Sequence, residues 1–235
     1  MAVLYSWLGR VPTNWLELVE AVCDPVSIKP IPNQTWLFGR ELNLPIGAEL
    51  DQLKILGDAF SKICDLSSIQ LKQIKCVPVF PPQFNDEIER LGNKASLLSA
   101  STLGIVRSLL DQTDNDVEIG CDKHGGRSHY TGLIQEILTD EFVFVGRESL
   151  AISEYQFCEN DRDVRIRFEA KGESFLPTAL ASMVSKYVRE VFMVLWNDFW
   201  QLQIPDLKPT KGYPQDAKRF KAEIAIAQQE LGIRD

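Results

Sequence analysis

The chain has 235 residues, of which 45% are hydrophobic and 25% are charged, and its formal net charge is −8. This length suits one domain, or one domain with an appended segment, and the composition is ordinary for a globular protein. The negative charge argues against a protein that coats nucleic acid through bulk positive charge, although local patches can still bind a polyanion. No apolar run is long enough to span a bilayer, so we expect no membrane partner.

Five cysteines are widely spaced and show no paired metal-binding motif. An odd number of isolated cysteines is typical of buried, reduced thiols. The apolar start, Met1–Trp7, lacks the basic region and the cleavage pattern of a signal peptide. These features predict a cytoplasmic protein.

The first third of the chain consists of short predicted elements separated by prolines. The expected elements are a short strand over Met1–Trp7, a helix over Asn14–Cys23 with Thr13 or Asn14 as its N-cap, a brief strand over Trp36–Phe38, and a helix over Pro45–Cys64.

The remaining chain alternates between strand-like and helix-like patterns. The expected strands are Ile69–Phe80, Val117–Cys121, Phe142–Gly146, Ala151–Phe157 and Val164–Phe168, and the expected helices are Asn93–Leu110, Tyr130–Leu138, Pro177–Trp200 and Gln215–Gly232. The turn Glu159–Asp163 between two of these strands predicts a hairpin. Together these elements predict an α/β protein with a mixed sheet flanked by helices.

The long helix near Pro177–Trp200 has distinctive flanks. A proline suits the first turn of a helix, and Ser182 and Lys186 share one helix face because they are four residues apart. The motif Lys171-Gly172-Glu173 precedes this helix, and the motif Lys211-Gly212-Tyr213-Pro214 follows it.

This pattern resembles the C-terminal third of type 2 ribonucleases H. The matching residues are Lys171, Gly172, Leu176, Ala179, Ala181, Ser182, Lys186, Arg189, Glu190, Lys211, Gly212, Tyr213 and Pro214. Glu173 stands one position away from the aspartate of the family, and the family's opening strand with its first two acidic residues is not found. The resemblance covers about Ile69–Leu231.

The resemblance implies a single ribonuclease H-like domain over residues 1–235, with a mixed sheet around the long helix. Residues 1–68 would be a divergent or truncated N-terminal part, and residues 69–235 would be the family-like part. A missing opening strand would expose a sheet edge, which a homodimer would cover.

The resemblance also implies metal-dependent cleavage of RNA in RNA–DNA hybrids, with Mg or Mn as the cofactor. In such sites two cations about 4 Å apart activate a water and stabilise the leaving oxygen, and carboxylates hold the cations. The expected catalytic residues and metal ligands are Asp122, at the end of a predicted strand, and Glu173. Each also has a simple structural explanation, since aspartate often begins a turn and negative charge is favourable before a helix.

Four further residues are expected to bind the substrate. Lys123 and Arg127 flank the glycine pair after Asp122 and would hold phosphate oxygens. Lys186 would face the anionic cluster, and Tyr213 would stack on a sugar or base. His124 or His129 is a weaker candidate for a proton shuttle.

Two carboxylates are a poor cage for two magnesium ions, and the family site uses four. Hydrolysis would therefore be impaired, or the chain would be a catalytically inactive relative that binds an RNA–DNA hybrid, another nucleic acid or a protein. A third hypothesis is an unrelated α/β enzyme. The sequence offers no nucleophile elbow, phosphate-binding glycine loop, dinucleotide fingerprint or zinc spacing in its favour.

Overall fold

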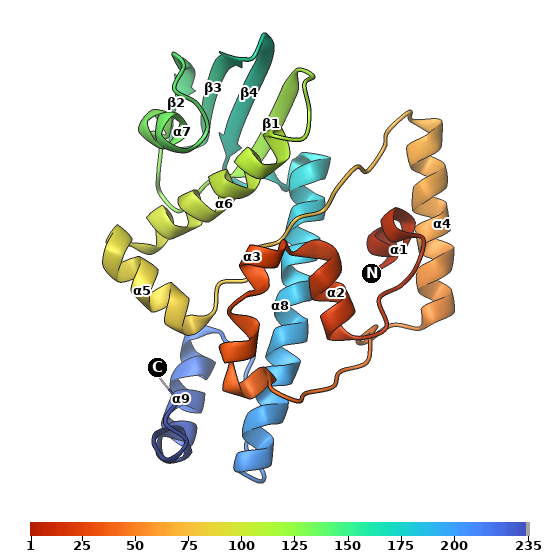
Figure 1. Cartoon of the computed structure of the whole chain (residues 1–235), viewed down its shortest axis with the longest axis vertical. Coiled ribbons are helices and arrows are strands. Elements are labelled where there is room, and N and C mark those ends of the chain that lie inside the picture. Colours follow the sequence, from red (N-terminus) through yellow and green to blue (C-terminus); the bar gives the residue numbers. More distant parts are fainter. Residues whose placement is uncertain (234–235) are drawn as a thin grey trace. The chain divides into compact units, whose positions relative to one another are not determined.

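The computed structural model of the chain describes residues 1–233, which form two compact units (Figure 1). The sheet unit contains residues 79–184, and the helical unit contains residues 1–78 and those from 185 onward. The division expected at residue 69 falls inside the helical unit, and the last two residues of the expected domain lie outside the described part. Among the described residues, no helix combines the length and the apolar character needed to cross a membrane.

The sheet unit is built on four strands in the order β1-β4-β3-β2. They are β1 (Val117–Asp122), β2 (Phe144–Glu148), β3 (Ile152–Glu159) and β4 (Arg162–Glu169). Strands β1 and β4 are parallel, whereas the β4–β3 and β3–β2 pairs are antiparallel. The mixed sheet confirms the predicted α/β class, and the predicted hairpin joins β3 to β4.

The helices of the sheet unit are α5 (Pro81–Leu91), α6 (Lys94–Leu110), α7 (Thr131–Ile137), the 3-10 turn η3 (Gly172–Ser174) and the start of α8 (Leu176–Gln203). Helix α6 begins where the Asn93 side chain accepts a hydrogen bond from the Ser96 N–H at 2.9 Å. Such a cap satisfies a backbone donor that the helix itself leaves unpaired. The predicted helix over Asn93–Leu110 is therefore confirmed.

One face of the sheet forms the core of this unit. Along β4 the buried apolar residues are Val164, Ile166 and Phe168, and the exposed Arg165 and Arg167 lie between them. This alternation follows from the two-residue period of a strand. Apolar side chains of α6 and α7 cover the buried face, and the Tyr130 ring stacks on Phe168 with 3.7 Å between ring centroids.

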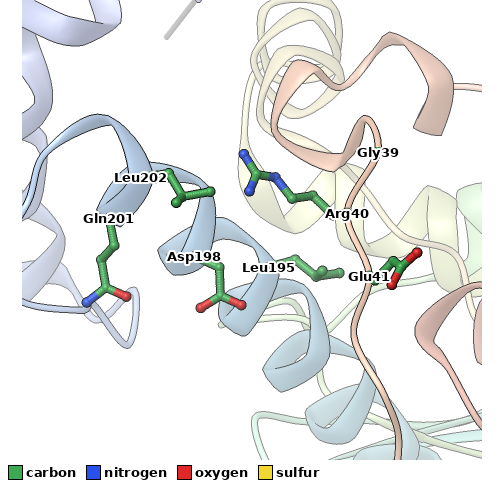
Figure 2. A pocket seen from close by; sticks show the side chains of 7 residues that line it. All are labelled: Gly39, Arg40, Glu41, Leu195, Asp198, Gln201 and Leu202. Atoms are coloured by element: carbon green, nitrogen blue, oxygen red, sulfur yellow. The ribbon is translucent and has the colours of Figure 1, made fainter.

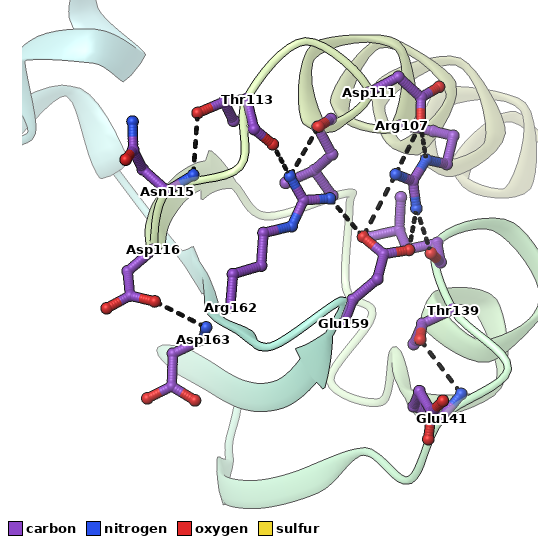
Figure 3. A network of polar contacts seen from close by, with 12 residues as sticks. Arg107, Asp111, Thr113, Asn115, Asp116, Thr139, Glu141, Glu159, Arg162 and Asp163 are labelled. Atoms are coloured by element: carbon purple, nitrogen blue, oxygen red, sulfur yellow. Dashed lines mark hydrogen bonds and ion pairs between the residues drawn. The ribbon is translucent and has the colours of Figure 1, made fainter.

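A partly buried ion-pair network closes the β3–β4 end of the sheet (Figure 3). The Glu159 carboxylate accepts hydrogen bonds from both Arg107 and Arg162. Arg107 also donates to Asp111 and to the backbone carbonyl of Leu138, which ties α6 to the end of α7. The Arg162 side chain is only 5% exposed, so the carboxylate compensates a cation that has little access to water.

The helical unit consists of short helices, two helices of 17 residues and the C-terminal part of one long helix. Its elements are α1 (Ala2–Leu8), α2 (Trp15–Val22), α3 (Pro25–Ile28), η1 (Ile31–Asn33), η2 (Thr35–Leu37), α4 (Leu50–Leu66), the remainder of α8, and α9 (Pro214–Glu230). Edge-to-face aromatic contacts join its core, with Trp36 against Phe192 and Trp196, and Trp15 against Phe192. The helix predicted over Asn14–Cys23 is confirmed, with Asn14 as its cap.

Three strands predicted before residue 81 are wrong. Residues 2–7 belong to α1, which packs on α4. The prediction was wrong because the periodicity of a short apolar run cannot distinguish a strand from a helix. Trp36–Phe38 overlaps the 3-10 turn η2. Residues 69–80 contain only an isolated bridge between Cys76 and Cys23, because this mostly half-exposed, proline-containing segment has no continuous ladder partner.

Candidate functional site

The ends of β1 and β4 bring acidic residues to one edge of the sheet. Asp122 and Glu169 are direct partners in the parallel register, so their Cα atoms lie about 5 Å apart. The Gly172 N–H donates to Asp122 Oδ1 at 3.3 Å, and Glu173 is the next residue of the chain. Asp122 is therefore hydrogen-bonded to the η3 turn that contains Glu173.

The three carboxylates nevertheless make separate contacts. Glu169 pairs with Arg167 at 3.0 Å, and Glu173 Oε1 accepts a hydrogen bond from Ser182 Oγ at 3.0 Å. Within residues 1–233, no group of three or more His, Cys, Asp or Glu side chains is arranged to hold a metal ion. Magnesium requires several converging oxygen ligands, so the residues present do not fit the expected two-metal centre.

A small hollow of about 80 Å³ lies beside this acidic edge. A Cβ atom at Gly120, in its wall, would lie 2.2 Å from Cδ1 of Phe175, so a larger residue there would require the Phe175 ring to shift. Thr178 Oγ1 donates to the Gly120 carbonyl at 3.1 Å and fixes the start of α8 on β1. The hollow is too small for a nucleotide and has the size of a few waters.

Lys123 is held by the protein itself. Its ammonium donates to the Ser149 carbonyl at 2.6 Å, to Ser153 Oγ at 2.7 Å and to the Arg127 carbonyl at 3.3 Å. These three acceptors use all three ammonium donors. Burial lowers the pKa of Lys123, and the contacts favour a role in fixing the loop over a role in gripping phosphate.

His124 and Arg127 also contact other side chains of the protein. His124 is 3% exposed, its Nδ1 lies 2.9 Å from Ser99 Oγ, and burial lowers its pKa to about 4. Arg127 donates to Ser96 Oγ at 3.2 Å, and its buried Nε has no hydrogen-bond partner among the described residues. The imidazole of His124 is therefore neutral at physiological pH and is shielded from solvent. His129, by contrast, is exposed and contacts Glu148.

Lys186 and Tyr213 belong to the helical unit, whereas the other expected site residues belong to the sheet unit. Lys186 is exposed on α8. Tyr213 is 63% exposed, and the guanidinium of Arg189 lies 5.6 Å from its ring centroid. The cation stacked on Tyr213 supplies a structural reason for an aromatic residue in this turn.

The outer face of the sheet carries residues that the sequence reasoning missed. We call this the open face and define it by Phe144, Arg147, Glu154, Arg165 and Arg167. The register places Arg147, Glu154 and Arg167 in one row across three strands, and Phe144 and Arg165 in the next row. The alternation along β4 could have predicted that Arg165 and Arg167 share one face, because every second residue of a strand points to the same face.

The arginines of the open face are accessible, and two of them are loosely paired, whereas Arg167 forms a 3.0 Å ion pair with Glu169. The exposed fractions of their side chains are 58% for Arg147, 63% for Arg165 and 49% for Arg167. The ion pairs Arg147–Glu154 and Arg165–Asp163 span 3.6 Å and 3.9 Å. Exposed pairs of this kind contribute about 1 kcal/mol or less, so Arg147 and Arg165 can exchange a carboxylate for another anion at low cost.

An aromatic pair lies at the β2 side of the open face. Phe144 is 64% exposed and Phe142 is 69% exposed, and their rings meet edge to face with 4.8 Å between centroids. Large aromatic side chains are rarely left this exposed without a partner. Exposed rings beside arginines provide the two kinds of contact that nucleic acids use, stacking and phosphate binding.

Comparisons of the chain with protein-family models, with curated proteins and with solved structures give no match. The resemblance to ribonucleases H therefore depends on the motifs around the long helix alone.

Proposed function

We propose that the sheet unit is a ribonuclease H-like module that binds nucleic acid on its open face and lacks an assembled metal centre. The observation that supports this proposal is the presence of Phe144, Arg165 and Arg167 on the same accessible face of a four-stranded sheet. The resemblance to ribonucleases H supports nucleic acid as the class of partner.

A single-stranded segment fits this face better than a duplex does. Unstacked bases can lie on aromatic rings, and this stacking contributes about 1–3 kcal/mol per base. The guanidiniums of Arg165 and Arg167 lie on the strand next to β3, within reach of phosphates that follow a base held at Phe144. Because the whole chain carries a net charge of −8, binding is expected to be weak and strongly dependent on salt.

The experiment that tests this proposal is fluorescence anisotropy with labelled single-stranded RNA. We expect the double variant Arg165→Gln/Arg167→Gln to weaken binding at every salt concentration. Loss of two phosphate contacts should reduce the slope of log K against log salt by about 1.4, since each contact with a single strand contributes about 0.7. Phe144→Ala should weaken binding with little change in this slope.

Arg90→Gln is the matched control, because Arg90 is an exposed arginine on α5, away from the open face. This variant should bind RNA as the unmodified chain does. Equal losses in Arg90→Gln and in the double variant would show that only overall charge matters. No binding of single-stranded RNA, of an RNA–DNA hybrid or of duplex DNA at low salt would contradict the proposal and would favour a protein partner.

A further inference from the structure

The helical unit contains a larger hollow, of about 540 Å³, between the segment after η2 and the last turns of α8 (Figure 2). Arg40 and Glu41 line it from that segment, and Leu195, Asp198 and Leu202 line it from α8. Its volume is in the range of pockets that hold small molecules. None of the functional expectations drawn from the sequence involves these residues.

The backbone of Arg40 is fixed on both sides. Its N–H donates to the Leu37 carbonyl at 3.2 Å, and its carbonyl accepts from Trp15 Nε1 at 3.0 Å. Its guanidinium lies over the Phe199 ring, 5.4 Å from the centroid. The Arg40 side chain therefore packs on the Phe199 ring, and Figure 2 shows it extending toward Leu202.

The side-chain nitrogens of Arg40 have no acceptor in the described part of the chain. Its Nε is buried and makes no hydrogen bond, and no carboxylate of residues 1–233 forms an ion pair with it. A guanidinium has five N–H donors, and buried donors are almost always paired in native proteins. A planar guanidinium that is held by an aromatic ring and lacks an acceptor is suited to bind a carboxylate through two parallel hydrogen bonds.

The same hollow also carries negative charge. Asp198 is exposed on α8, and Glu41 follows Arg40 directly in the chain. Figure 2 shows the Asp198 carboxylate on the α8 side, apart from the Arg40 guanidinium. Leu195 and Leu202 add apolar surface between the charged groups. The lining therefore presents one cation, two anions and an apolar wall to the same space.

We propose that this hollow binds a small zwitterion, namely an α-amino acid with an apolar side chain. The carboxylate of the ligand pairs with Arg40, its ammonium group faces Asp198, and its side chain contacts Leu195 and Leu202. A simple anion would meet the two carboxylates without compensation, and a simple cation would leave Arg40 unpaired. The combination of charges thus selects a ligand that carries both signs.

The test is isothermal titration calorimetry of the full chain with three matched probes. L-leucine carries both charged groups, 4-methylpentanoate lacks the amine, and 3-methylbutylamine lacks the carboxylate. We expect L-leucine to bind with a Kd of about 1 mM or tighter, and each of the other probes to bind at least about tenfold more weakly. No binding of L-leucine, or equal binding of 4-methylpentanoate, would overturn the proposal.

Variants separate recognition from folding. Arg40→Gln and Asp198→Asn should each weaken L-leucine binding by about tenfold or more. Arg40→Lys keeps the charge but loses the planar fork, so it should also bind more weakly while its circular dichroism spectrum stays unchanged. Lys54→Gln and Asp51→Asn, on the exposed side of α4, are the charge-matched controls and should bind normally. Unchanged binding in Arg40→Gln would contradict the assignment.

Discussion

Replacing Glu159 with alanine is expected to lower the free energy of unfolding of the sheet unit by about 3–5 kcal/mol. The Glu159 carboxylate neutralises Arg107 and Arg162, and the Arg162 side chain is 5% exposed. Removing the carboxylate would leave the Arg162 guanidinium in an environment where water cannot take the place of the carboxylate. Urea unfolding followed by circular dichroism measures this loss.

Two further variants test the cause of this effect. Glu159→Gln should lose less stability than Glu159→Ala, because its amide oxygen can still accept a hydrogen bond from one arginine. Glu89→Ala, on the exposed side of α5, should change stability by about 0.5 kcal/mol or less. If Glu159→Ala proves as mild as Glu89→Ala, the network is not a significant source of stability.

Acid is expected to destabilise the sheet unit between about pH 6.5 and about pH 4 through His124. Burial lowers the pKa of His124 from 6.5 to about 4, so in this window the unfolded chain binds a proton that the folded chain does not. The contribution of this neutral histidine is complete above pH 6.5 and is lost as the pH falls toward 4. The shift corresponds to about 3 kcal/mol across this window.

Urea unfolding at several pH values checks this expectation, and the chain contains only two histidines. His124→Phe keeps a ring against Tyr130 and Phe168 and should flatten the pH dependence. His129→Gln, which changes an exposed side chain, should keep it. An NMR titration in which the His124 ring protonates near pH 6.5 would contradict the prediction directly.

The sheet unit was largely predictable because its elements carry strong local patterns. Val164, Ile166 and Phe168 alternate with charged residues, and Asn93 is a good cap before a long amphipathic run, so strand β4 and helix α6 were placed to within two residues. The strand predicted over Ile69–Phe80 was wrong because a strand depends on a neighbour, which a short apolar pattern does not reveal.

The candidate site was harder to predict than the elements that carry it. The sequence placed Asp122 at the end of a strand, and the structure confirms that position. It could not show that Lys123 would bind three protein oxygens, because the acceptors Ser149 and Ser153 are distant in sequence. The sequence also could not predict that Phe144 and Arg165 lie on one face, since this depends on the register of three strands.

The most direct test of the proposed function uses a labelled RNA–DNA hybrid that carries a single-stranded RNA extension, incubated with Mn²⁺. Binding and cleavage are measured together for the unmodified chain, for Asp122→Asn and for Arg165→Gln/Arg167→Gln. We expect the hybrid to be bound and to stay intact, with binding unchanged in Asp122→Asn and reduced in the arginine double variant. Cleavage that disappears in Asp122→Asn would contradict the absence of an assembled metal centre and would establish a metal-dependent nuclease.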